Sequence, residues 1–69
     1  MEMIKQLKII RAINTELNKL ERQRNVYLNL LYEDISGDTE EFILASVMEI
    51  NEDIVYMEEI LKEIVSSPN

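Results

Sequence analysis

Apolar residues recur along the second half of the chain with the spacing of a helix that buries one face. Seven of them follow one another at alternating intervals of four and three residues: Ile43, Val47, Ile50, Ile54, Met57, Leu61 and Ile64. This heptad pattern places the seven side chains along one side of an α-helix. Leu44, Met48 and Val55 lie beside them and widen the apolar stripe. A stripe of this width indicates a helix that contacts more than one neighbour.

The first half of the chain repeats the pattern less strictly. Apolar positions recur near seven-residue intervals with others between them: Met3, Ile10, Ile13, Leu17, Leu20, Tyr27 and Leu31. The opposite positions are polar: Lys8, Thr15, Arg22 and Asn29. The periodicity predicts one helix over about residues 2–35 and a second over about residues 39–66.

The segment between the two helices carries stop and start signals for helices. Gly37 is the only glycine, and the pattern predicts that it ends the first helix in the left-handed conformation. Asp38 is predicted to cap the second helix, with Glu41 completing a capping-box-like pair. A turn at about residues 36–38 then joins two antiparallel helices, and residues 1–69 form one helical-hairpin domain.

A two-helix hairpin cannot cover all of this apolar surface by itself. The residues expected to stay in contact with water are Ile4, Ile9, Leu30, Leu44, Met48 and Val55. Large apolar patches are rare on soluble monomers, and two hairpins packed together would cover such patches. The predicted fold is therefore an all-α antiparallel hairpin that pairs with a second copy into a homodimeric four-helix bundle.

Composition supports pairing and limits the chemistry. The 69 residues include no cysteine and no histidine, so disulfides, thiolate metal sites and histidine-based catalysis are excluded. We expect no catalytic residue, no cofactor and no metal. No apolar run approaches the length of a membrane span, and the first five residues lack the pattern of a signal peptide. The expected location is the cytoplasm, with no membrane partner.

Charge is divided unevenly between the two halves of the chain. The formal net charge is −7, with +1 on residues 1–36 and −8 on residues 37–69. A hairpin folded about Gly37 would set Arg24 level with Glu49, so that the basic half meets the acidic half. Exposed ion pairs contribute only about 0–1 kcal/mol each, so their expected role is to set register.

The first functional hypothesis is a small non-enzymatic module that binds another protein, as a regulator, inhibitor or assembly factor. The expected surface is the acidic outer face of the second helix with its exposed apolar and aromatic residues: Met48, Glu49, Glu52, Asp53, Val55, Tyr56 and Glu59. Aromatic anchors are common at protein interfaces, and the acids favour a partner with a basic surface. The same acids could instead form a carboxylate metal site, imitate nucleic acid, or serve only as a solvated face.

The second hypothesis is a regulator that binds nucleic acid through the outer face of the first helix. Basic residues recur along that face: Lys5, Lys8, Arg11, Lys19 and Arg22. Such a stripe can contact phosphates, or it can be a solvated face that pairs with the acidic helix. The predicted architecture resembles the Rop-type dimeric hairpins, which bind RNA on one face of a bundle. The resemblance is one of shape, with no shared motif.

Overall fold

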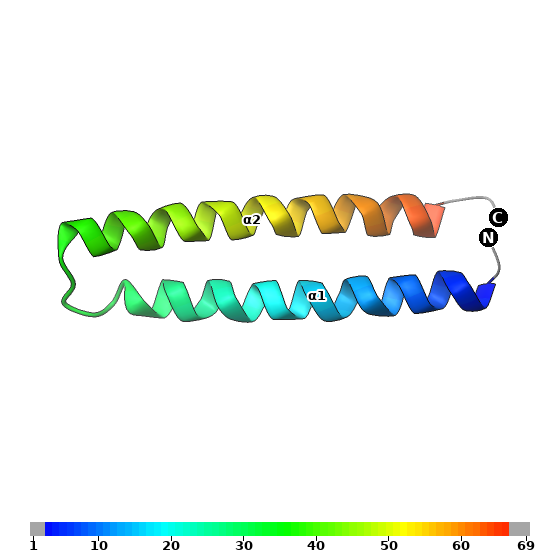
Figure 1. Cartoon of the computed structure of the whole chain (residues 1–69), viewed down its shortest axis with the longest axis horizontal. Coiled ribbons are helices and arrows are strands. Elements are labelled where there is room, and N and C mark those ends of the chain that lie inside the picture. The colour runs from blue at the N-terminus through cyan, green and yellow to red at the C-terminus, as the bar shows by residue number, and fades with distance from the viewer. Residues whose placement is uncertain (1–2, 67–69) are drawn as a thin grey trace.

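The protein is described by a computed structural model of residues 3–66, which form two antiparallel α-helices side by side (Figure 1). Helix α1 spans Met3–Leu30 and helix α2 spans Gly37–Ser66. The predicted start of the first helix at residue 2 lies outside the described residues. Neither helix is long and apolar enough, within the described residues, to cross a membrane. The predicted helical hairpin is confirmed.

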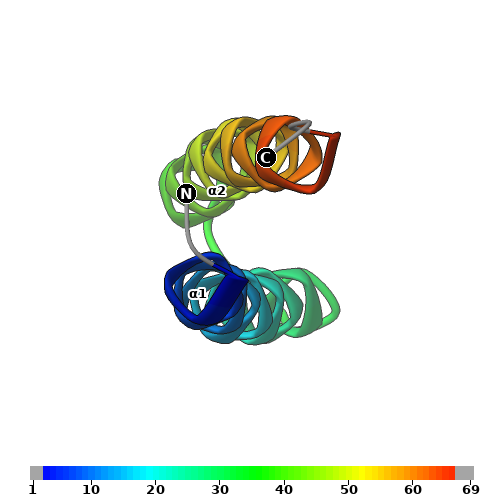
Figure 2. The ribbon, with the colours of Figure 1, turned by 90° about the vertical axis from the view of Figure 1, so that its right-hand side faces the viewer.

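The core is a single layer of apolar side chains between the two helices. The buried residues are Ile13, Leu17 and Leu20 of α1 and Ile43, Val47, Ile50 and Ile54 of α2. Met57, Leu61 and Ile64 continue the line and are half-buried. Every residue of the predicted heptad line on α2 therefore faces α1. The helices cross at a shallow angle (Figure 2), as expected when a heptad line must follow its partner helix.

The turn lies earlier in the chain than the sequence pattern predicts. Helix α1 ends at Leu30 instead of residue 35, and residues 31–36 form the connection. The N–H groups of Leu31, Tyr32 and Glu33 donate to the carbonyl oxygens three residues before them, at 3.1–3.2 Å. These tight bonds satisfy carbonyl groups at the end of α1 without a glycine.

The prediction that Gly37 ends α1 and Asp38 caps α2 is wrong. Gly37 is the first residue of α2 and does not have a positive φ. Ser36 caps the helix instead: its hydroxyl accepts the Thr39 N–H at 3.3 Å, and its carbonyl accepts the Glu40 N–H at 2.9 Å. A serine one residue before the glycine can start the helix earlier, because its short side chain reaches the free N–H groups. The capping box with Glu41 does not form at this start point.

Within residues 3–66, two side-chain hydrogen bonds cross between the helices. The Gln6 side-chain amide donates to the carbonyl of Ile64 at 2.6 Å, close to the end of the hairpin opposite the turn. Arg24 Nη1 donates to Asn51 Oδ1 at 2.9 Å. The sequence sets Arg24 level with Glu49, and the residue to which its side chain bonds is Asn51, two positions further along α2.

The hairpin is thin and elongated. It measures 51 × 15 × 11 Å, and its radius of gyration is 16.0 Å, against about 11 Å for a compact domain of this length. The apolar residues that were expected to remain in contact with water are all exposed: Ile4, Ile9, Leu30, Leu44, Met48 and Val55. One layer of core therefore leaves much of the apolar surface uncovered.

Candidate protein-binding surfaces

The outer face of α2 carries a shallow hollow, which we call the α2 hollow. It has a volume of about 410 Å³ and is lined by Asn51, Glu52, Val55, Tyr56 and Glu59. Residues three, four and seven positions apart stack along one side of a helix, which explains why these five side chains meet. The hollow thus follows directly from the helical spacing of α2.

The α2 hollow combines an apolar floor with an acidic rim. Val55 and Tyr56 are 52% and 64% exposed, although both side chains are large and largely apolar. Glu52 and Glu59 are exposed on either side of them along the helix. This arrangement suits an apolar side chain of a partner with a basic residue beside it.

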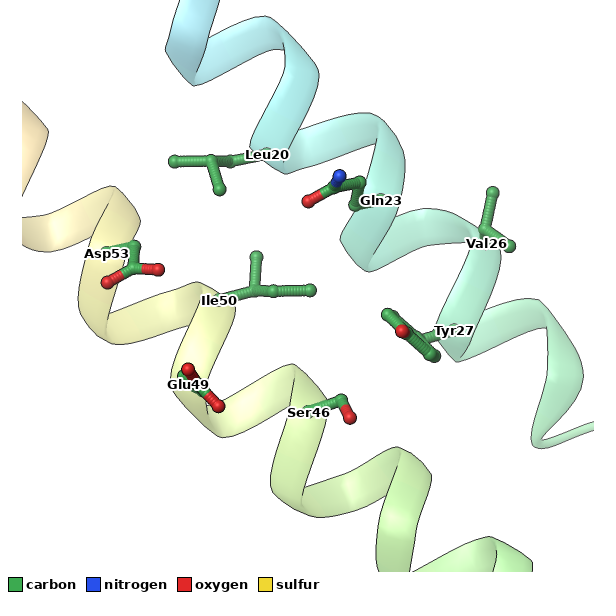
Figure 3. A pocket seen from close by; sticks show the side chains of 8 residues that line it. All are labelled: Leu20, Gln23, Val26, Tyr27, Ser46, Glu49, Ile50 and Asp53. Carbon is green, nitrogen blue, oxygen red and sulfur yellow. The ribbon is translucent and has the colours of Figure 1, made fainter.

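A second concave surface, the interhelical groove, lies between α1 and α2 toward the turn. Its volume is about 450 Å³, and Figure 3 shows its lining residues: Leu20, Gln23, Val26, Tyr27, Ser46, Glu49, Ile50 and Asp53. Leu20, Tyr27 and Ile50 point into the space between the helices (Figure 3). Glu49 and Asp53 place acidic groups along the α2 edge of this groove.

The structure divides six of the seven predicted binding residues between two surfaces. Glu52, Val55, Tyr56 and Glu59 meet in the α2 hollow, whereas Glu49 and Asp53 line the interhelical groove. Met48 is exposed on α2 and lines neither. Periodicity alone does not separate these two acids from Tyr56, which follows Glu49 by seven residues and Asp53 by three and lies on the same side of α2.

Sequence reasoning missed Asn51 in the α2 hollow and Tyr27 with Gln23 in the interhelical groove. Asn51 has no charge and no large apolar group, so only its position four residues before Val55 could have indicated it. Tyr27 was assigned to the core, and it is half-buried at the edge of the core cluster. The groove depends on contacts between two helices, which a single helical pattern does not contain.

The basic residues of α1 lie on the side of that helix that faces away from α2. Lys5, Lys8, Arg11, Lys19 and Arg22 are all exposed. At about 100° per residue, they fall within one outward stripe of α1. Glu16 and Glu21, the two acids of α1, fall on opposite flanks of this stripe. The structure therefore gathers the five predicted basic residues on one surface.

The acids of α2 do not converge on a common point. Within residues 3–66, no group of three or more acidic side chains is placed to hold a metal ion. The acids instead alternate around the exposed part of the helix, at Glu52 and Glu59 on its outer face and at Glu49 and Asp53 on its flank.

The chain matches no protein-family model, and comparisons with curated proteins and with solved structures also gave no match. The geometry and charge of the two concave surfaces and the basic stripe are therefore the basis for the functional proposal.

Proposed function

We propose that the chain is a small, non-enzymatic protein-interaction module that binds another protein through the outer face of α2. The observation that carries this proposal is the α2 hollow, in which exposed Val55 and Tyr56 lie between Glu52 and Glu59. An exposed aromatic side chain beside an apolar one costs solvation free energy, and a partner that covers both would recover it. The proposed location is the cytoplasm.

The chemistry of the hollow defines the partner. Its floor accepts a branched aliphatic or aromatic side chain, and its rim attracts a lysine or arginine on the same partner surface. An amphipathic helix meets both conditions, because an apolar and a basic residue one turn apart lie on neighbouring parts of one face. The favoured partner is therefore a basic amphipathic helix on another protein.

A titration with a defined probe tests this proposal. The probe is a synthetic amphipathic helix of leucine and lysine, and the matched control replaces every lysine with glutamate. The isotope-labelled protein is followed by nuclear magnetic resonance. The basic peptide should shift the amide signals of Glu52, Val55 and Tyr56, whereas the acidic peptide should not.

Charge reversal makes the test specific to the hollow. The double variant Glu52→Lys and Glu59→Lys should weaken binding of the basic peptide by about tenfold or more, a change of about 1.4 kcal/mol. Glu33→Lys alters an exposed acid in the turn and should have little effect. Equal loss of binding in both variants, or binding that does not move the signals of the hollow, would contradict the proposal.

The second part of the proposal is that two hairpins pair into a four-helix bundle. The chain exposes 5603 Å². A compact monomer of its mass of 8.1 kDa would expose roughly 4,500 Å², an excess of about 1,100 Å². A standard stable interface buries about 800 Å² on each partner, so pairing of two faces would remove most of the excess.

An alternative function is nucleic-acid binding through the basic stripe of α1, which the outward grouping of its five residues favours. A gel-shift assay with duplex RNA and duplex DNA should then show binding that weakens steeply with salt. Neutralising Lys8, Arg11 and Arg22 should abolish the shift, whereas Lys62→Gln on α2 should not. The absence of a shift at low salt would exclude this alternative.

A further inference from the structure

We propose that a second copy of the chain covers the interhelical groove, with α1 of each copy over α2 of the other and both turns at the same end of the bundle. This inference rests on the proposed pairing of hairpins and specifies its geometry. It identifies the face that is covered, the helices that become neighbours, and the direction of one hairpin relative to the other.

The groove face is better suited to a second copy than the opposite face of the hairpin. On the groove face, Leu20, Tyr27 and Ile50 form a partly open apolar floor. Glu49 and Asn51 flank Ile50, so Asn51 lies toward the opposite face, where Arg24 bonds to it at 2.9 Å. Three asparagines of α1 also lie on the face opposite the groove: Asn14, Asn18 and Asn25. The core edge on the opposite face is therefore lined by more polar groups than the groove, although Leu7 and Leu28 are exposed there.

Charge decides which helices become neighbours. Helix α1 carries six basic residues against two acids, a net charge of +4, and α2 carries nine acids against one lysine, a net charge of −8. Two face-to-face arrangements have two-fold symmetry. If the two-fold axis runs perpendicular to the helices, α2 of one copy packs on α2 of the other. If the axis runs parallel to the helices, α1 of one copy packs on α2 of the other. The second arrangement keeps the two strongly acidic helices on a diagonal and gives each a basic neighbour.

A two-fold axis parallel to the helices also places a lysine of the second copy near the acidic residues of the groove. Rotation about this axis leaves every residue at its own height along the bundle. Leu20 lines the same groove as Ile50, so the neighbouring Lys19 of the second copy lies at the height of this stretch of α2. Glu49 and Asp53 both belong to this stretch. The pairing thus supplies the basic neighbour that neither acid receives from the groove of its own copy.

The distance between the two turns distinguishes the arrangements. The chain has no cysteine, so Asp34→Cys in the exposed turn provides one attachment point for a nitroxide spin label. With helix axes about 8–10 Å apart, turns at the same end give a label separation well below the hairpin length. Turns at opposite ends give a separation near 51 Å. Pulsed electron paramagnetic resonance of the labelled dimer should show the short distance, and a distance near 51 Å would overturn the proposal.

Two arginine substitutions test which face is covered. Ser46→Arg places a bulky charged group in the groove and should raise the dissociation constant of the dimer by about tenfold or more. Asn25 is exposed on the side of α1 that faces away from Gln23 and Tyr27. Asn25→Arg adds the same bulky charged group there and should leave the dissociation constant of the dimer nearly unchanged. Helicity measured on both variants checks that each remains folded. The reverse order of effects would overturn the proposal.

Failure of this inference differs from failure of the proposed protein binding. A chain that stays monomeric and still binds the basic peptide at the α2 hollow removes the inference and keeps the binding function. A dimer with a short turn-to-turn distance that ignores the peptide keeps the inference and removes the binding function. Masses that grow beyond two copies would indicate edge-to-edge association of the basic stripe with α2, and they would also overturn the inference.

Discussion

Arg24 of α1 reaches across the hairpin and donates a hydrogen bond from Nη1 to Oδ1 of Asn51 on α2, at 2.9 Å. Arg24 interrupts the apolar side of α1 and is half-buried, so its charged end needs a polar partner at the edge of the core. Asn51 supplies that partner on the face opposite the interhelical groove. The bond therefore links the two helices at this level and places a polar pair on the face opposite the groove.

A double-mutant cycle on Arg24→Ala and Asn51→Ala should give a coupling free energy of about 0.5–1 kcal/mol in urea unfolding, since the bond is partly open to solvent. The parallel cycle on Arg24→Ala and Glu49→Ala should give a coupling near zero. A larger coupling with Glu49 would show that Arg24 pairs with that acid and not with Asn51.

Removal of the Ser36 hydroxyl should loosen the start of α2. Ser36→Ala leaves the Thr39 N–H without its side-chain acceptor, and we expect a loss of about 1 kcal/mol in the free energy of unfolding. Ser36→Asp retains an acceptor and should keep most of the stability. Thermal unfolding of the wild type and the two variants under the same conditions compares their stabilities. Equal stability of the wild type and Ser36→Ala would show that another residue caps the helix.

Replacement of Gly37 by alanine should stabilise the hairpin. Gly37 has no positive φ, it begins α2, and an added Cβ would meet no atom within 4 Å. Alanine restricts the unfolded chain and favours the helix, so the gain should be about 0.4–1 kcal/mol. A loss of stability would mean that Gly37 ends α1 in the left-handed conformation, as the sequence pattern predicts.

Ile54 and Val55 are neighbours in sequence with opposite expected roles. Ile54 is 6% exposed in the core, so Ile54→Val should lower the free energy of unfolding by about 1 kcal/mol. Val55→Ala removes an exposed side chain from the floor of the α2 hollow and should change stability by less than about 0.5 kcal/mol. The same Val55→Ala variant should weaken binding of the basic peptide, which Ile54→Val should not. Unchanged peptide binding by Val55→Ala would argue against the hollow as a binding site.

The predictable part of this fold is the part that depends on helical periodicity. The spacing of apolar residues identifies both helices, and it assigns Ile43, Ile50 and Ile54 to the buried line of α2 correctly. The turn was misplaced because Gly37 and Asp38 are stronger signals by residue type than Ser36. Local hydrogen bonds at Leu31 and Glu33 end α1 without a distinctive sequence.

The candidate sites were predictable to a similar extent. Spacing along α2 brings Glu52, Val55 and Tyr56 together, and the structure places them in one hollow. The assignment of Glu49 to the same surface failed because that residue faces the interhelical groove. The groove depends on contacts between α1 and α2, and the spacing of residues along α2 alone does not contain those contacts.

We propose that the hairpin completes its core with a second copy of the chain and binds another protein around Glu52, Val55 and Glu59. Absolute molar mass from light scattering should be measured over a concentration series, with helicity followed in parallel. We expect a helical species of twice 8.1 kDa whose dissociation on dilution is accompanied by loss of helicity. A fully helical species of 8.1 kDa at every concentration would contradict it.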